Sequence, residues 1–186
     1  MVQEVFLTNE NAIRGMSLID NNVESKYLLS ALREAQDVYY QQVVGKTLYD
    51  KLRKLVGDGV IDDAGNEAYK ALLDESQMFL VYQSVANLCL VTNVKISNGG
   101  LQQTTDENLT TLNLDDTFTY QQHLKDKADF YMRRLQEYLW ENRADLPELT
   151  QTKCNQLNAM LNSAADCGLW LGGKRGKGYN KCRKRF

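Results

Sequence analysis

The feature that most limits the fold of this chain is a stretch without any charged residue, Ser76–Val94. Its apolar side chains fall on nearly every face of a helix, and such a helix must be buried in lipid or among other helices. A membrane span needs about 20 mostly apolar residues, and polar side chains within it are costly. The stretch carries several of these: Gln77, Gln83, Ser84, Asn87, Thr92 and Asn93. We therefore predict the central helix of a soluble helical domain and no membrane span.

Helical periodicity before this stretch predicts a short helix at Ala12–Ile19, a long one at Glu24–Val44 and another at Thr47–Val56. Gly45 fits the position just past the end of the long helix, where a glycine backbone is favoured. The residues of the long helix that the spacing turns inward are Leu28, Ala31, Leu32, Ala35, Val38, Tyr39, Gln42 and Val43.

A last long helix is predicted over Thr117–Asn142, with Asp115, Asp116 or Thr117 as its N-cap. Its inward stripe comprises Tyr120, Leu124, Ala128, Tyr131, Leu135, Tyr138 and Leu139. The expected fold is therefore mainly α: a small helical bundle around the buried central helix.

Between the last two long helices, residues 94–114 are polar and lack a helical period. Asn98, Gly99 and Gly100 form a strong turn signal, because Asn-Gly is the commonest sequence of two-residue hairpin loops. The flanking residues alternate only weakly. We predict a β-hairpin or a long exposed loop here, and a disordered insertion is the alternative.

The charges divide the chain into two parts. Residues 1–150 hold 14 Lys/Arg and 23 Asp/Glu, about −9, whereas residues 151–186 hold 8 and 1, about +7. We interpret 1–150 as one helical domain and 151–186 as a basic, glycine-rich, extended C-terminal tail. The acidic helical domain, residues 1–150, is termed the body. A basic tail attached to an acidic body indicates an anionic partner, which could be nucleic acid, an acidic protein surface or the body of a neighbouring copy.

The tail holds the candidate binding residues of this chain. Basic side chains on a glycine-rich backbone suit phosphate contacts, and interleaved aromatic residues can stack on bases or fill pockets of a protein partner. A solvated terminus without a partner is a third interpretation. The candidate residues are Trp170, Leu171, Lys174, Arg175, Lys177, Tyr179, Lys181, Arg183, Lys184, Arg185 and Phe186.

No pattern of catalytic or metal-binding residues is evident, so we expect no enzyme, no metal and no cofactor. His123 is the only histidine, and the four cysteines include no CxxC pair. The acidic pairs Asp62-Asp63, Asp74-Glu75 and Asp115-Asp116 suit helix starts. The run GGKRGKG lacks the first glycine and the hydroxyl of a phosphate-binding loop, since Leu171 and Gly178 stand there.

Several segments nevertheless resemble a known family. These are Lys26–Gln36 (KYLLSALREAQ), Val43–Gly45 and Leu48–Leu52 (LYDKL), with further likeness at Tyr69–Leu73 and in the central helix. They are similar to head-to-tail connector (adaptor) proteins of tailed bacteriophages, closest to those of crAss-like phages of gut Bacteroidetes. The resemblance covers roughly residues 1–150 and does not extend to the tail.

The resemblance implies a structural protein of the virion that forms a homo-oligomeric ring, typically of about twelve copies, beneath the portal protein of the capsid. Such a ring extends the channel for the packaged DNA and docks other tail or connector proteins. It would be made in the host cytoplasm, which agrees with the absence of a signal peptide and with free thiols. The alternative is a helical nucleic-acid-binding or regulatory protein that uses the basic tail.

The tail interpretation generates a first prediction. Deletion of Leu169–Phe186 should leave the helical fold and its cooperative thermal melt intact, because the apolar periodicity ends before these residues, and should weaken docking to the partner. Circular dichroism and a partner pull-down measure the two effects. Loss of the cooperative melt would place the tail in the core and contradict the interpretation.

Overall fold

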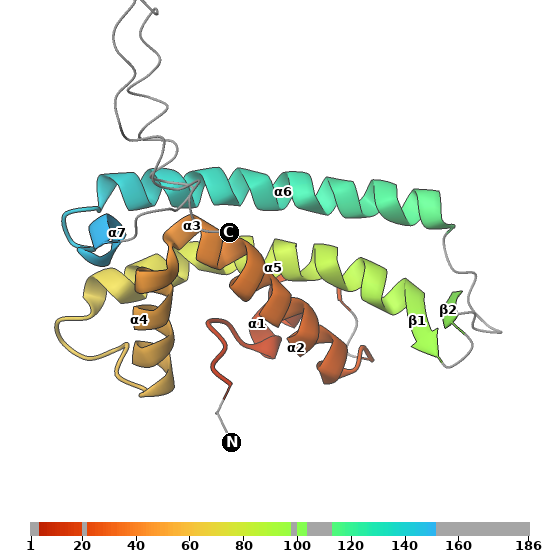
Figure 1. Cartoon of the computed structure of the whole chain (residues 1–186), viewed down its shortest axis with the longest axis horizontal. Coiled ribbons are helices and arrows are strands. Elements are labelled where there is room, and N and C mark those ends of the chain that lie inside the picture. Colours follow the sequence, from red (N-terminus) through yellow and green to blue (C-terminus); the bar gives the residue numbers. More distant parts are fainter. Residues whose placement is uncertain (1–3, 20–21, 98–99, 104–112, 152–186) are drawn as a thin grey trace, which may run out of the picture.

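One long pair of helices forms the frame of the structure. This computed structural model describes residues 4–19, 22–97, 100–103 and 113–151. The pair consists of α5 (Glu67–Asn93) and α6 (Leu114–Glu141), which run antiparallel along their full lengths (Figure 1). The remaining elements are α1 (Glu10–Met16), α2 (Ser25–Glu34), the π-helical segment η1 (Ala35–Tyr40), α3 (Gln41–Val44), α4 (Lys46–Gly57), β1 (Val94–Ser97), β2 (Gly100–Gln103) and α7 (Glu148–Gln151).

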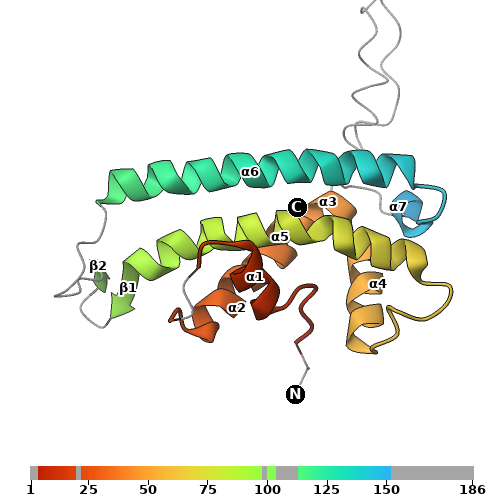
Figure 2. The same ribbon diagram turned by 180° about the vertical axis from the view of Figure 1, so that it is seen from behind.

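The prediction of a small helical bundle around a buried central helix is confirmed. α6 covers one side of α5, while α1, α2 and α4 lie on the other side (Figures 1 and 2). α5 runs without a break through Asp74–Ser76, so the uncharged stretch and the helical turns before it are one helix. Among the described residues, no helix has both the length and the apolarity that crossing a bilayer requires.

Two groups of buried side chains fill the bundle, and α5 and α6 contribute to both. The first surrounds Tyr40, Leu52, Phe79 and Leu135 near α3, α4 and α7. The second surrounds Ile13, Leu32, Val81 and Leu124 near α1 and α2. The core therefore extends along α5 and does not form one compact ball.

Two serines of α5 are buried with hydrogen-bond partners. The hydroxyls of Ser76 and Ser84 donate to the carbonyl oxygens one turn earlier, those of Leu72 and Leu80, at 2.6 Å each. Ser76 also shares a hydrogen bond of 2.8 Å with the buried Tyr40 hydroxyl. These groups are costly in lipid but acceptable in a protein core, where partners are available.

The inward face of the long helix at Glu24–Val44 differs from its prediction. The backbone is helical over Ser25–Val44, but η1 is a π-helix, in which each turn holds more residues than an α-turn. Because this widening moves later side chains around the axis, Val38 is 45 % exposed and Gln42 is not buried, although the α-helical spacing places both inside. Gln36 and Tyr40 are buried instead.

Gln36 uses its buried position to hold the N-terminal segment. Its Oε1 accepts a hydrogen bond from the Leu7 amide, and its Nε2 donates to the Val5 carbonyl oxygen, at 3.1 Å each. The Gln77 Nε2 donates to the Leu7 carbonyl oxygen at 3.3 Å. Side-chain amides thus replace the hydrogen bonds that a neighbouring strand would give this extended segment.

The start and inner face of α6 also differ from their predictions. The N-cap is Asn113, whose Oδ1 accepts a hydrogen bond from the Asp116 amide at 2.8 Å, and not Asp115, Asp116 or Thr117. Tyr120 is 43 % exposed, whereas Gln121 is buried and donates to the Ala86 carbonyl oxygen at 3.0 Å. A hydrophobicity pattern misses such a residue because its burial depends on a partner from another helix.

The shorter helices lie close to their predicted positions, and part of the polar insertion is described. α1 begins two residues before and ends three residues before its prediction, and Gly45 has the positive φ of 83° expected after a helix end. β1 and β2 form an antiparallel pair in which Val94 faces Gln103 and Ser97 faces Gly100. Asn98, Gly99 and residues 104–112 lie outside the described part.

The burial of α5 leads to a stability prediction. Leu80→Ala, at a fully buried position, should lower the free energy of unfolding by about 2–5 kcal/mol, because it removes apolar contacts and leaves a cavity. Leu18→Ala is the matched control at a side chain that is 96 % exposed, and it should change the same quantity by less than about 0.5 kcal/mol. Urea melts compare them. Equal effects would contradict the buried placement of Leu80.

Candidate interaction surfaces

Nearly all of the predicted binding residues lie outside the part of the chain that the structure describes. All the candidates of the tail, Trp170 to Phe186, lie outside the described residues, as do Asn98 and Gly99. Gly100 is the first residue of β2, opposite Ser97. The candidate surfaces of the described part therefore come from residues that the sequence did not single out for binding. They are joined by the point from which the tail leaves the helical domain.

That point is the short helix α7. Leu146 and Leu149 are buried in the first core group, beside α3 and α4. The Tyr69 hydroxyl, from α5, lies 2.9 and 3.0 Å from the two carboxylate oxygens of Glu148, to which it donates. The chain beyond Gln151 thus starts from an anchored position at the α4 end of the bundle.

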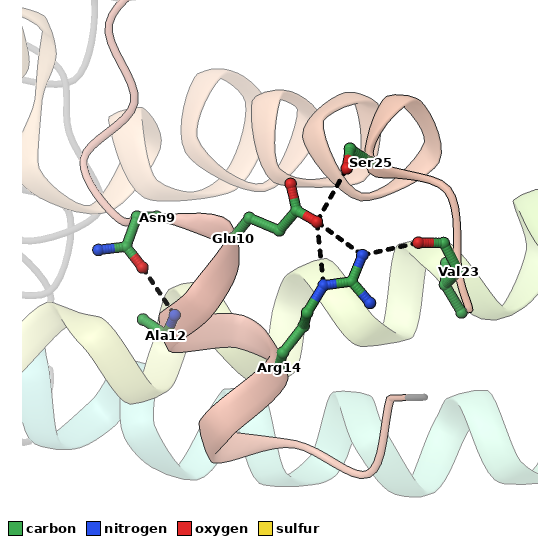
Figure 3. Close-up of polar contacts among 6 residues, drawn as sticks. All are labelled: Asn9, Glu10, Ala12, Arg14, Val23 and Ser25. Atoms are coloured by element: carbon green, nitrogen blue, oxygen red, sulfur yellow. Dashed lines mark hydrogen bonds and ion pairs between the residues drawn. The ribbon is translucent and has the colours of Figure 1, made fainter. Parts of the chain in front are cut away.

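A polar network holds α1 against the start of α2 (Figure 3). The Arg14 guanidinium pairs with the Glu10 carboxylate, with an Nη2–Oε1 distance of 2.6 Å, and donates to the Val23 carbonyl oxygen at 2.6 Å. The Ser25 hydroxyl donates to the same carboxylate at 2.9 Å. The Asn9 side chain caps α1 by accepting from the Ala12 amide at 2.7 Å. We assign this network a structural role, because its groups bind one another.

An aromatic cluster lines the first shallow hollow, which we term the tyrosine hollow, with a volume of about 350 Å³. The rings of Tyr82 and Tyr131 stack at 5.4 Å between centroids, and the Phe130 ring meets Tyr131 edge-on at 5.3 Å. The Lys127 ammonium lies 5.6 Å from the centre of the Tyr82 ring. Phe130 is 63 % exposed, which is unusual for a residue of this size. The hollow is lined by Tyr82, His123, Asp126, Lys127, Phe130 and Tyr131.

A second hollow, which we term the glutamine hollow, has a volume of about 230 Å³. Side chains of η1, α3, α5 and α6 meet there. Phe79 is buried and Met132 is partly buried, while the amides of Gln42, Gln83 and Gln122 add polar groups. The hollow is lined by Tyr39, Gln42, Phe79, Gln83, Gln122, Lys125, Asp129 and Met132.

The two hollows lie on opposite flanks of α6. At 100° per residue, the buried Leu124, Ala128 and Leu139 define the side of α6 that faces α5. Lys127 falls on one flank of that line, and Lys125 falls on the other. The body therefore presents two chemically different flanks, one aromatic and one rich in amides.

The acidic pairs and the histidine have structural surroundings. Asp62 pairs with Lys70 at 2.7 Å, and Glu75 pairs with Arg134, whose Nε lies 2.5 Å from its Oε1. Asp115 and Asp116 lie in the first turn of α6, where negative charge is favourable. His123 is exposed at the edge of the tyrosine hollow. Within the described ranges, no three His, Cys, Asp or Glu side chains are placed to hold a metal ion.

These features define a helical-bundle protein with two different exposed flanks and an anchored point of exit for its C-terminal segment. Residues 40–159 match the model of a family of unknown function (DUF6712), and the chain belongs to this family. The match begins within η1 and includes α3 to α7. Searches of curated proteins and of solved structures found no significant match.

Sequence reasoning missed both hollows. The tyrosine hollow combines Tyr82 with residues more than 40 positions later, and no local pattern links them. The glutamine hollow requires η1 to turn Tyr39 and Gln42 toward α6. The one available signal was the unusual number of tyrosines, ten in 186 residues, which indicates half-buried contacts at surfaces.

The contact that anchors α7 gives a pH prediction. Burial and the hydrogen bond to the Glu148 carboxylate raise the pKa of Tyr69 to about 12, whereas a tyrosine in an unfolded chain ionises near 10. Because the pKa of Tyr69 is higher in the folded state, its neutral hydroxyl contributes fully to the free energy of unfolding below pH about 10. This contribution is lost as the pH rises toward about 12. The advantage of the wild type over Tyr69→Phe in free energy of unfolding should therefore shrink across this range.

Urea melts at steps between these two pH values measure that advantage. Glu148→Gln serves as a second variant, because it keeps an acceptor oxygen and removes the charge. It should reduce the pH dependence without abolishing the hydrogen bond. An advantage that stays constant with pH would show that Tyr69 ionises equally in both states.

Proposed function

We propose that this chain is a structural protein of a bacteriophage virion, a subunit of the connector ring between the capsid portal and the tail. The observation that carries the proposal is the resemblance of Lys26–Gln36, Val43–Gly45 and Leu48–Leu52 to head-to-tail connector proteins. These segments lie in α2, the start of η1, α3 and α4, and α2 and α4 cover α5 on the side opposite α6 (Figure 1).

The two different flanks of the body suit a ring. Identical subunits close a ring through heterologous contacts, in which one surface of each copy meets a different surface of the next. The tyrosine hollow and the glutamine hollow lie on opposite flanks and differ in chemistry. Stacked tyrosines and an exposed phenylalanine are typical of residues that contribute strongly to protein interfaces.

The charge of the body supports the same proposal. Residues 1–150 carry about −9. Acidic walls repel the phosphates of DNA, so a channel lined by them lets the genome pass without retaining it. The proposed position of the ring is the head–tail junction of the virion, where it extends the DNA channel and docks tail components.

Assembly on the portal tests this proposal. The full chain is mixed with the portal protein of its own phage, and size-exclusion chromatography with light scattering gives the mass of the complex. We expect a ring of subunits bound to the portal, with the portal of an unrelated phage as the control. The free chain alone is not decisive, because a ring can require the portal as a template.

The contrary result is equally specific. A monomer or dimer that ignores its own portal and binds DNA in a salt-sensitive manner would overturn the connector proposal. It would favour a nucleic-acid-binding protein that uses the basic tail. The same samples, run at two salt concentrations with and without DNA, give both outcomes.

A further inference from the structure

The glutamine hollow has the chemistry of a site for an extended peptide. Its apolar side chains, Phe79, Tyr39 and Met132, belong to or pack against the first core group, and the amides of Gln42, Gln83 and Gln122 lie around them. A volume of about 230 Å³ is below the ~300–1,000 Å³ of most small-molecule pockets, so it suits one or two side chains of a peptide.

The same molecule shows how such amides bind a peptide. Gln36 accepts from the Leu7 amide and donates to the Val5 carbonyl oxygen, and the Leu7 side chain is buried beside it. One glutamine thus satisfies both backbone groups of an extended segment while an apolar side chain enters the core. The glutamine hollow offers the same combination of amides and apolar surface.

A buried amide beside the hollow has unused hydrogen-bonding capacity. Gln83 is buried, and its Nε2 donates to the Asn87 Oδ1 at 3.0 Å. The Asn87 Nδ2 is buried and finds no hydrogen-bond partner in the described part of the chain. Asn87 follows Gln83 by one helical turn, so this pair of amides continues along α5 from the edge of the glutamine hollow.

The chain's own C-terminal segment is long enough to reach the glutamine hollow. The described part ends at Gln151, just after Leu149, which is buried in the core group that also contains Phe79. Gly168 lies 17 residues further on, so the connection can span up to about 56 Å. Its sequence, GLWLGG at 168–173, offers large apolar side chains between glycines, which allow close backbone approach.

We propose that residues 168–173 bind in the glutamine hollow of the same chain, with Trp170 and Leu171 against Phe79 and Met132. The glutamine amides then pair with the peptide backbone, and Lys174 and Arg175 follow on the side of Asp129. The opposite charges of tail and body, about +7 and −9, favour this association. Covalent attachment favours the copy's own tail over that of a neighbour, because it raises the effective concentration.

This inference does not depend on the connector proposal. It assigns an intramolecular binding surface, whereas the ring concerns contacts between copies. A tail bound in this way would form part of the amide-rich flank that a neighbouring copy meets. The experiments below use the free full-length chain, so their failure leaves the ring assay unaffected.

Disulfide trapping tests the position of the tail. Cys167 lies three residues before Trp170, and Lys125→Cys introduces a thiol at the glutamine hollow. The matched control is Lys127→Cys, two residues away on the opposite flank. Under mild oxidation, we expect the introduced thiol of Lys125→Cys to form a disulfide with Cys167 of the same chain. The rate of this reaction should be at least about tenfold higher than the rate at which the thiol of Lys127→Cys bonds to Cys167.

Non-reducing gels and peptide mapping identify each bond. A bond between two chains would assign the hollow to a neighbour's tail and overturn the proposal. Equal trapping rates for the two variants, or no bond to Cys167 from Lys125→Cys, would also overturn it.

Fluorescence provides an independent measurement. Trp140 and Trp170 are the only tryptophans, so Trp140→Phe leaves Trp170 as the reporter. The emission maximum of Trp170 should lie at a shorter wavelength than in the unfolded chain, because the ring is buried in the hollow. Adding Met132→Lys should move this maximum to a longer wavelength. Phe130→Lys, on the tyrosine hollow, is the control and should leave the emission unchanged. The proposal would be overturned if Trp140→Phe alone, with the glutamine hollow intact, had the emission maximum of a solvent-exposed tryptophan.

Discussion

The burial of α5 is the constraint on which the rest of the structure depends. This helix is 27 residues long, and it is apolar on nearly every face of its uncharged part. No single partner helix can cover such a surface. α6 therefore covers one side along the full length, and the shorter helices α1, α2 and α4 cover the other (Figures 1 and 2). The elongated shape of the core follows from this arrangement.

Side-chain amides recur as connectors between segments that are distant in sequence. Gln36 and Gln77 hold the N-terminal segment, and Gln121 ties α6 to the backbone of α5. Within α5, Gln83 pairs with Asn87 one turn later. An amide can donate and accept at once, so it satisfies a backbone or another amide without introducing charge into the core. The Asn87 Nδ2 is the point at which this arrangement is incomplete within the described residues.

The surfaces of the body differ because the coverage of α5 is asymmetric. On one flank, η1 and α3 approach α6 and form the glutamine hollow. On the other flank, Tyr82 and Tyr131 stack across the α5–α6 contact beside the exposed Phe130. A subunit with two unlike flanks suits a head-to-tail ring better than a two-fold dimer, in which one patch meets its own copy. The proposed connector role depends on this asymmetry as well as on the sequence resemblance.

The sequence by itself determined the fold class, the central place of Ser76–Val94, the positive φ of Gly45 and the approximate bounds of α2–α3, α4 and α6. These follow from local periodicity and from backbone preferences, which neighbouring residues set. Only the tertiary structure decided the exposure of Val38 and Tyr120 and the burial of Gln36 and Gln121, because a π-helical segment and partners from other helices override the local pattern. The formation of both hollows also depends on the tertiary structure, since each hollow requires side chains brought together from at least two helices. Hydrophobic spacing specifies which helices form, whereas the pairing of buried polar groups specifies how they fit together and which surfaces remain.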